Sequence, residues 1–378
     1  MHTPQHPYLS RLDHLRFLAA SLVVLFHFFH TKLGDLRSAN PLVSFVDEGH
    51  TGIALFMVIS GFIFTVIAGQ REVRYFAFLR NRIIRIYPLF VFAVFLQLFI
   101  STYNDQRNYG FLQLLGWLMP FRSDTVPLSP QFVQLWTIWV EFQFYLIFPF
   151  LLLFSRRFGA RYLWGLLLLL IVMRALVFAA LGSVRFIAYE TIFGRLDQFL
   201  VGMLVGRLWL AHAGGALAGA KPSLSPLWLL LAGISLVLGL HYFSLTVGFS
   251  ELASPLWVVW PPVEAAMWAA FMWAYLGTRW RGPLALRTRV DTTLAALGAM
   301  SFSIYVMHNL VISAYNARLP LLSFFDLLPG VYGPISHTLA TGLVVVLPMV
   351  LVVSTLTYWL IERPFLSLRG PYLKPLTQ

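Results

Sequence analysis

The stretch SRLDHLRFLAASLVVLFHFFH, residues 10–30, decides the fold. It has the length of a transmembrane helix, because about 20 mostly apolar residues cross the hydrocarbon core of a bilayer. It begins with Ser10 and Asp13, an S-x-x-D pattern that is typical of a helix N-terminal cap. No A-x-A-type cleavage site follows, so we expect a retained first membrane helix rather than a signal peptide.

Two ionisable side chains lie inside this apolar helix. Eleven residues separate Arg16 from His27, which is almost three turns, so both project from one helix face about 16 Å apart. An ionisable group within a bilayer costs roughly 2.5–3.5 kcal/mol. Snorkelling would explain Arg16 alone, and an interhelical hydrogen bond would explain His27 alone. Together they favour a polar path through a helix bundle, whereas His30, about 40° away, is expected to be interfacial.

The whole chain has the composition of a polytopic membrane protein. Of its 378 residues, 59% are hydrophobic and 11% are charged, and the mean hydropathy is +0.76. Soluble domains are about 25% charged. Apolar segments run from end to end, so we expect one membrane domain over residues 1–378 with no appended soluble domain. The lack of Cys excludes disulfides and thiolate catalysis.

Apolar segments predict about ten membrane-spanning helices in an all-α bundle. Arginines and lysines are about three times as frequent in one set of loops, which places both termini in the cytoplasm. The net charge of +12 is explained by this bias, without nucleic acid. Residues 111–120 are too short to cross and are expected to be re-entrant or interfacial. The predicted spans are residues 11–30, 50–68, 83–101, 133–154, 162–181, 187–206, 225–242, 256–276, 294–316 and 337–361.

Six motifs, in order along essentially the whole chain, resemble those of the acyltransferase 3 family of bacterial membrane proteins. They are LDHLRFLAASLVVLFH at 12–27, GIALFMVISGF at 52–62, FLRNRIIRIYP at 78–88, LWTIWVEFQFY at 135–145, SFSIYVMH at 301–308 and IERP at 361–364. The chain departs from the family pattern at Gly52-Ile53-Ala54, where relatives often have Gly-Val-Asp, and at Phe56-Met57, where they often have two Phe.

The resemblance implies an enzyme of the bacterial cytoplasmic membrane. It would move an acyl group, often acetyl, from cytoplasmic acyl-CoA to a hydroxyl of an extracytoplasmic carbohydrate or related acceptor. Acyl-CoA would be a co-substrate, with no permanently bound cofactor and no metal. The polyanionic nucleotide must stay at the inner face, so only the slim pantetheine arm can thread the bundle towards an outer reaction centre.

Arginines at the inner end of the third span suit the donor. Arg80, Arg82 and Arg85 crowd this end, and a guanidinium binds phosphate through paired hydrogen bonds. Arg82 and Arg85 are three residues apart and share a helix face, so with Arg16 they are expected to bind acyl-CoA. The alternative is that their charge only orients the protein. Glu362 is expected to pair with Arg16, Arg82 or Arg85.

His27 is the candidate general base, because an imidazole can take the proton of the acceptor hydroxyl near neutral pH. A covalent acyl-histidine is a lesser alternative. Glu141, deep in the fourth span, is the candidate that orients His27. A structural pair of Glu141 with Arg174 or Arg195 is the alternative. Acidic residues of the first outer loop could also orient the histidine: Asp35, Asp47 and Glu48.

Further residues are expected to support the site. Ser60 beside Gly61 is expected to let helices approach closely and is a weaker candidate nucleophile. Trp136 and Trp139 either flank a sugar ring or belong to an aromatic belt at the membrane surface. His308, in the ninth span, is a secondary site candidate.

Two other functions remain open on the sequence alone. A secondary transporter or flippase for a glycan or anionic solute would also use buried Arg, Glu and His. It predicts inverted repeats with paired broken helices, which the sequence does not show. A glycosyltransferase that uses a lipid-linked sugar would favour acidic outer loops, whereas the loops here are short and mixed in charge.

Overall fold

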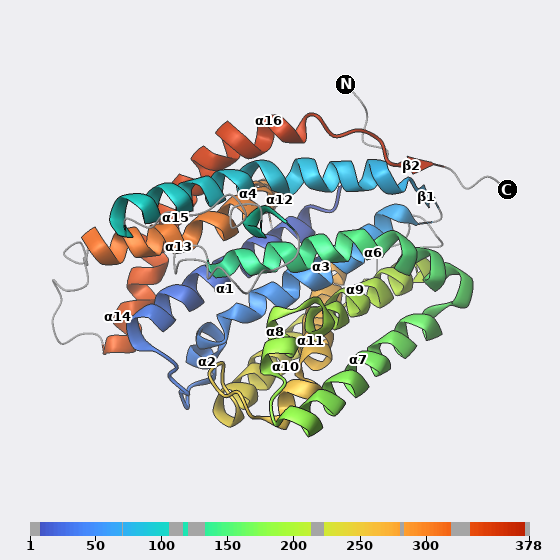
Figure 1. Ribbon diagram of the computed structural model, residues 1–378, viewed down its shortest axis with the longest axis horizontal. Coiled ribbons are helices and arrows are strands. Elements are labelled where there is room, and N and C mark those ends of the chain that lie inside the picture. Colours follow the sequence, from blue (N-terminus) through green and yellow to red (C-terminus); the bar gives the residue numbers. More distant parts are fainter. Residues whose placement is uncertain are drawn as a thin grey trace.

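The computed structural model describes residues 8–69, 71–105, 116–119, 133–212, 223–279, 283–318 and 333–374, and these residues are almost entirely helical (Figure 1). The predicted all-α class is confirmed for them. Most of the predicted surface segment 111–120 lies outside the described residues. The only strands in these ranges are the two-residue β1 (Glu72–Val73) and β2 (Leu373–Lys374).

The α-helices follow one another in the order seen in Figure 1. They are α1 (Ser10–Leu33), α2 (Pro41–Asp47), α3 (Gly52–Ala68), α4 (Tyr75–Asp105), α6 (Trp136–Phe158), α7 (Ala160–Leu181), α8 (Arg185–Glu190), α9 (Ile192–His212), α10 (Pro226–Thr246), α11 (Trp260–Gly277), α12 (Leu284–Ala299), α13 (Ser301–Arg318), α14 (Pro334–Thr341), α15 (Leu347–Thr357) and α16 (Arg363–Leu366). Short 3₁₀ turns are η1 (Gly49–Thr51), η2 (Val133–Leu135) and η3 (Pro255–Val258), and π-helical turns are η6 (Gly342–Val346) and η7 (Tyr358–Glu362).

Seven helical segments in the described part of the chain are long and apolar enough to cross a membrane, or eight if the bent pair α12 and α13 counts as one span. The chain is therefore a polytopic membrane protein, and ten spans stay a prediction. The remaining two predicted spans are α9 and α11, which carry buried polar residues such as Arg195, Asp197 and Glu264. A helix that is surrounded by other helices can carry such residues, because they do not face lipid.

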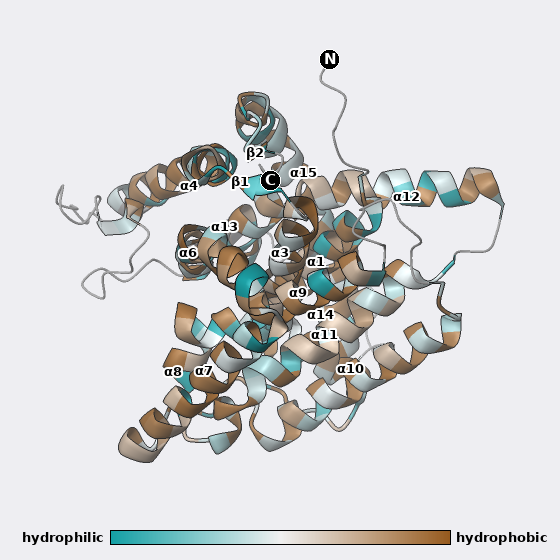
Figure 2. Cartoon of the chain, turned by 90° about the vertical axis from the view of Figure 1, so that its right-hand side faces the viewer, coloured by the Kyte–Doolittle hydropathy of each residue, from teal (hydrophilic) through white to brown (hydrophobic). Residues whose placement is uncertain are grey.

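Two predicted spans are broken, and their predicted bounds are wrong. The segment 187–206 divides between α8 and α9, where a Cβ added at Gly194 would lie 2.1 Å from the Ala188 carbonyl oxygen. The segment 294–316 bends by 64° between α12 and α13. A Cβ at Gly298 would lie 1.8 Å from the Asp13 carbonyl oxygen, so α12 docks tightly on α1 before the chain turns (Figure 2). Hydrophobic periodicity alone contains no signal for such tertiary contacts.

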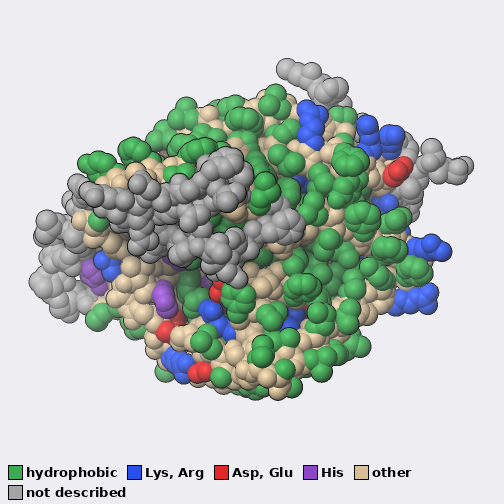
Figure 3. All heavy atoms as spheres, in the orientation of Figure 1, with side chains coloured by type: hydrophobic (Ala, Val, Ile, Leu, Met, Phe, Trp, Pro, Cys, Tyr) green, Lys and Arg blue, Asp and Glu red, His purple; other side chains and the backbone are tan. Residues whose placement is uncertain are grey.

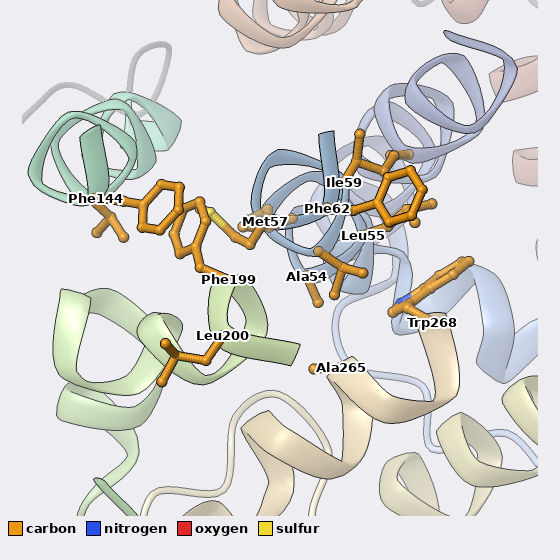
Figure 4. Packing of buried hydrophobic residues seen from close by; sticks show 14 of the residues in the cluster. Ala54, Leu55, Met57, Ile59, Phe62, Phe144, Phe199, Leu200, Ala265 and Trp268 are labelled. Atoms are coloured by element: carbon orange, nitrogen blue, oxygen red, sulfur yellow. The ribbon is translucent and has the colours of Figure 1, made fainter. Parts of the chain in front are cut away.

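The core of the bundle is built around the close approach of α3 and α9. A Cβ at Gly61 would lie 2.1 Å from the Phe199 carbonyl oxygen, and one at Gly202 would lie 2.2 Å from that of Val58. Glycines at these positions let the two helix backbones touch. Phe199 also stacks on Phe144 of α6 with ring centroids 3.7 Å apart, as Figure 4 shows. Gly61 thus has the predicted packing role and places the neighbouring Ser60.

Buried ion pairs tie α9 to its neighbours. Arg174 of α7 donates to Asp197 at 2.5 Å, and both side chains are buried. Arg195 lies 3.8 Å from Glu264 of α11, which also accepts a hydrogen bond of 2.8 Å from Gln198. Breaking such a pair would leave an uncompensated charge in the protein interior.

Both described ends of the chain lie at one end of the bundle. β1, which follows α3, pairs antiparallel with β2 at the C-terminal side, and Tyr8 and Tyr372 line the same cavity. We call this the inner end, because it is the end predicted to be cytoplasmic. Figure 3 shows several Lys and Arg side chains gathered there, beside a broad hydrophobic flank.

Candidate active site

A cavity of about 540 Å³ enters the bundle at the inner end, between α1, α3, α4, α6 and α13. This volume lies within the range of about 300–1,000 Å³ that is usual for ligand pockets. Five residues that the sequence singled out line it: Arg16, Ser60, Arg82, Arg85 and Glu141. Other polar lining residues include Asp13, Thr137, Tyr305 and Arg369. The cavity is therefore a cationic pocket at one end of the membrane domain.

Arg16 lies on the cavity wall, half-buried, nearly two turns after the start of α1. Its Nη1 atom is 2.6 Å from Asp13 Oδ1, and Asp13 also accepts a hydrogen bond from the Tyr8 hydroxyl. The predicted capping pattern is wrong, since α1 has no side-chain cap and Ser10 Oγ donates to Asp291 at 2.9 Å. The carboxylate of Asp13 is thus a counter-ion for Arg16, because it faces the guanidinium rather than the backbone N–H groups at the start of the helix.

Arg82 is held by aromatic rings. Its guanidinium carbon lies 5.0 Å from the ring centre of Phe64, 5.6 Å from Phe78 and 5.8 Å from Tyr145. In the described part of the chain, its Nε has no hydrogen-bond partner. Cation–π contacts fix the guanidinium without using its N–H donors. Arg82 is thus placed to donate hydrogen bonds to an anion in the cavity.

Arg85 forms an ion pair with Glu362. The Glu362 side chain is 1% exposed and that of Arg85 is 23% exposed, so the pair sits at the border of the cavity. Ser303 Oγ of α13 donates to the same carboxylate at 2.8 Å. The prediction that Glu362 pairs with one of three arginines is confirmed, with Arg85 as the partner. The pair links α4, α13 and the last helix around the cavity.

Glu141 is not the partner of His27, and this prediction is wrong. Its carboxylate accepts a hydrogen bond from Tyr145, one turn along α6, and it lines the cavity in the field of Arg85, Arg82 and Arg16. The alternative pairs with Arg174 or Arg195 do not form either, because those arginines bind Asp197 and Glu264. Sequence spacing gives the depth of a residue along its helix, but not the neighbour that it faces.

The imidazole of His27 contacts a second imidazole. His27 Nδ1 lies 3.3 Å from His308 Nε2, and the two rings are 4.8 Å apart at 60°. His27 Nδ1 also lies 2.9 Å from the Val23 carbonyl oxygen, and His308 Nδ1 lies 2.7 Å from that of Tyr305. In the described residues, the acids of the first outer loop bind elsewhere: Asp35 accepts from Ser250, Asp47 from the Leu36 N–H, and Glu48 pairs with His50.

The two backbone carbonyls determine the tautomers of the histidine pair. A carbonyl oxygen only accepts, so each Nδ1 carries the proton, and His308 Nε2 has a lone pair directed at His27. His27 Nδ1–H is then shared between Val23 and His308. This leaves the lone pair on His27 Nε2, which makes no hydrogen bond with the described residues. An oriented imidazole with a free Nε2 has the form of a general base.

The histidine pair lies just beyond the deep end of the cavity. Arg16 lines the cavity beside Tyr305 of α13, and His27 contacts His308 on the next turn of α13. Arg16 thus faces the cavity that α13 helps to line, and His27 contacts α13 itself. Neither histidine lines the cavity, whose wall at this point includes Phe56 and Tyr305, and the Tyr305 ring lies 5.7 Å from that of His308. The cavity therefore does not extend to His27, and Tyr305 lies between its lining and the histidine pair along α13.

Trp136 lies in the protein interior rather than in a belt at the membrane surface. It is 9% exposed. Its ring centre lies 5.4 Å from that of Tyr189 and 5.6 Å from the guanidinium carbon of Arg195. Trp139 is also buried, and its indole N–H donates to the Trp117 carbonyl oxygen at 3.3 Å. A contact of Trp136 with an acceptor stays a prediction.

Sequence reasoning did not single out several of the cavity residues, among them Tyr305 and Arg369. Tyr305 lies one turn before His308 in the motif SFSIYVMH, and its hydroxyl bonds Thr137 at 2.8 Å. Tyr305 precedes the candidate His308 by three residues and so shares its helix face, which could have identified it as a site residue. Arg369, beyond the last span, carried no signal except its charge. Within the described residues, no three His, Asp or Glu side chains are arranged to hold a metal ion.

Comparisons with known proteins agree with the motifs. A family model described as an acyltransferase domain matches residues 9–359. The exopolysaccharide production protein ExoZ of Rhizobium meliloti (strain 1021) is 28% identical over 214 residues, which is 53% of this chain and 63% of that protein. The chain thus matches less than two thirds of this relative's length. No solved structure matches the present chain. Since the family model covers nearly the whole of this multi-pass membrane chain, the protein belongs to the acyltransferase 3 family.

Proposed function

We propose that this protein is an O-acyltransferase of a bacterial cytoplasmic membrane. It takes an acyl group, acetyl in the simplest case, from cytoplasmic acyl-CoA and transfers it to a hydroxyl of an extracytoplasmic carbohydrate. The observation that carries this proposal is the two-ended site. An arginine-lined cavity lies at the inner end, and an oriented histidine pair lies one helical turn of α13 beyond its deep wall.

The cavity suits the nucleotide part of acyl-CoA. Arg82 has no carboxylate partner among the described residues, and Arg85 keeps part of its surface exposed beside its pair with Glu362. Guanidinium groups bind phosphate with strong, charge-assisted hydrogen bonds. The deeper lining is mostly apolar and includes Ile53, Phe56 and Met57, which suits a slim pantetheine arm more than a charged group.

The histidine pair suits the transfer step. His27 Nε2 takes the proton of the acceptor hydroxyl as that oxygen attacks the thioester carbonyl carbon. The carbon–sulfur bond then breaks, and the imidazolium of His27 returns the proton to the CoA sulfur. The products are the ester and free CoA, with no net change in protons. His308 Nε2 accepts from His27 Nδ1–H, which orients the ring and stabilises its cationic form.

Tyr305 separates the donor from the base in this proposal. Its hydroxyl is held by Thr137 at 2.8 Å and by the Gln134 carbonyl oxygen at 3.0 Å. The thioester reaches His27 only when this side chain, or Phe56 beside it, moves aside. Displacing one tyrosine from two neutral hydrogen bonds costs about 1–3 kcal/mol, which binding of the donor can supply.

The acceptor is proposed from the relative and from the topology. The matched Rhizobium meliloti protein is named for exopolysaccharide production. His27 lies towards the outer end of α1, where a carbohydrate outside the membrane would approach. The acceptor class is therefore an extracytoplasmic polysaccharide or its lipid-linked precursor, with hydroxyl groups as the acylated atoms.

The direct test is to replace His27 by Ala in the native host and to analyse surface glycans by mass spectrometry. We expect one glycan of the variant strain to be lighter than in the unaltered strain by the mass of the missing acyl group, which is about 42 Da for acetyl. His30→Ala is the matched control, because His30 is exposed one turn further on and stacks on Phe26. An unchanged acyl pattern in the His27 variant, at normal protein level, would refute the proposal.

A second measurement separates this function from transport. Purified protein should be stabilised against heat by acetyl-CoA and should release free CoA when the acceptor is present. The chain contains no Cys, so a thiol-reactive dye detects the released CoA without a background from the protein. Flux of a glycan across vesicles without any CoA requirement would favour a transporter instead.

A further inference from the structure

A segment after the last membrane helix reaches back over the mouth of the cavity. We call residues 366–374 the C-terminal strap. It supplies three of the residues that line the cavity: Leu366, Arg369 and Tyr372. The family model ends at residue 359, so the strap lies beyond the matched range. The cavity is therefore completed by an element that the family comparison does not describe.

The strap is fastened to the inner end of α4 by backbone and side-chain hydrogen bonds. Asn81 Nδ2 donates to the Gly370 carbonyl oxygen at 2.6 Å, and its Oδ1 accepts from the Gly370 N–H at 3.1 Å. The Arg74 N–H donates to the Tyr372 carbonyl oxygen at 2.8 Å. β2 then pairs with β1, beside α4 in Figure 2. On the other side, Arg80 Nη2 donates to the Leu368 carbonyl oxygen at 3.3 Å, so residue 369 is held between fixed points.

Arg369 stands at the rim of a cluster of like charges. The charges of Arg82 and Arg85 act on its guanidinium, which donates from Nε only to the Leu366 carbonyl oxygen, at 3.2 Å. Among the described residues, neither Arg369 nor Arg82 forms an ion pair with a carboxylate, whereas Arg16 and Arg85 do. Guanidinium groups that repel one another are stable together when a multivalent anion binds between them.

We infer that Arg369 binds the 3′-phosphate of the acyl donor at the rim of the cavity. This inference rests on the proposed function, in which acyl-CoA is the donor. Arg82 and Arg85 lie deeper, where the pyrophosphate would follow the pantetheine arm into the cavity. The 3′-phosphate is on the ribose, which together with the adenine lies beyond the pyrophosphate and so stays at the rim. The strap therefore adds recognition of the nucleotide to the donor site.

The test compares two ligands that differ in one phosphate. Full-length protein in detergent is titrated calorimetrically with CoA and with dephospho-CoA, which lacks the 3′-phosphate. Arg369→Gln should weaken CoA about fivefold at low salt, a magnitude typical of an exposed ion pair, and should leave dephospho-CoA unchanged. Arg369→Lys should give an intermediate loss, because it keeps the charge but not the paired donors.

Arg363→Gln is the matched control at the same end of the chain. Its guanidinium carbon lies 3.7 Å from the ring centre of Trp359, and the residue does not line the cavity. The affinities of this variant for CoA and dephospho-CoA should therefore stay within about twofold of those of the unaltered protein. Unchanged CoA affinity in both Arg369 variants, or an equal loss for both ligands, would overturn the inference alone. No CoA binding by the unaltered protein would overturn the proposed donor and this inference with it.

Discussion

His308 should control the rate of acyl transfer without contributing to donor binding. It is fully buried, lies outside the cavity and contacts His27 Nδ1 at 3.3 Å. The His27 ring has a second restraint, the Val23 carbonyl oxygen at 2.9 Å, so it stays oriented when His308 is replaced. We therefore expect His308→Ala to lower kcat, and to leave the KM for acyl-CoA unchanged.

The expected loss follows from the bond that disappears. When His27 takes a proton, its Nδ1–H becomes a charged donor, and a hydrogen bond to a charged group contributes about 1.5–3 kcal/mol. The corresponding fall in kcat is roughly 10- to 100-fold. His27→Ala should cost more, about 10²–10⁴-fold, because it removes the base itself. His308→Gln keeps an acceptor near the former Nε2 position, so it should recover roughly tenfold of the loss.

The assay measures free CoA with a thiol-reactive dye, in membranes that contain the native acceptor. Rates are compared at several acyl-CoA concentrations, so that kcat and KM separate. Thermal unfolding of each purified variant shows whether the buried substitution has disturbed the fold. Two results would refute the role of His308: a normal kcat in the Ala variant, or a raised KM for acyl-CoA with kcat unchanged.

Three other substitutions probe the scaffold, each by thermal unfolding of the purified protein. Gly61→Ala should cost about 1–3 kcal/mol, since the new methyl meets a carbonyl of α9. Gly165→Ala meets nothing within 4 Å and should stabilise the protein by up to about 1 kcal/mol through helix propensity, so equal effects would contradict the packing argument. Asp197→Asn leaves Arg174 buried without its counter-ion and should cost about 3–5 kcal/mol, and replacing both residues by apolar ones should restore most of it. Burial, and to a lesser extent the negative charge of Asp35, raises the pKa of Glu48 to about 8. The stability gained by protonation of Glu48 should therefore be lost as the pH rises from about 5 to 8. Glu48→Gln should flatten the dependence of the unfolding free energy on pH in this range, and an unchanged dependence would contradict the argument.

Features that depend on a single helix were predictable from the sequence. The spacing of Arg16 and His27 predicted one shared face of α1, and the structure has Arg16 on the cavity that α13 helps to line and His27 in contact with α13, because an α-helix has a fixed repeat. The need of Glu362 for a cation followed from its position at a helix C-terminus, where a carboxylate opposes the helix dipole. Gly61 was predictable as a contact because small residues mark close helix pairs in membranes.

Features that depend on the rotation of one helix against another were not predictable. Glu141 lies at the expected depth on α6, but its carboxylate turns towards the arginines of the cavity rather than His27. The bend at Met300 arises because α12 docks on α1 through Gly298, a contact of residues far apart in sequence. Hydrophobic runs show that a segment can be a span, whereas tertiary contacts decide where it breaks.

Closure of the site by Tyr305 follows from the demands on any enzyme that works across a membrane. A shaft that stayed open from the arginines to His27 would conduct protons and small ions between the two sides. It would also let water reach the thioester, which would then hydrolyse. In the proposed mechanism, the bonds of Tyr305 to Thr137 and Gln134 would keep the path shut in the absence of donor, and they are weak enough to yield to an arriving pantetheine arm. The donor would thus fill the opening that it makes, so that transfer proceeds without a leak.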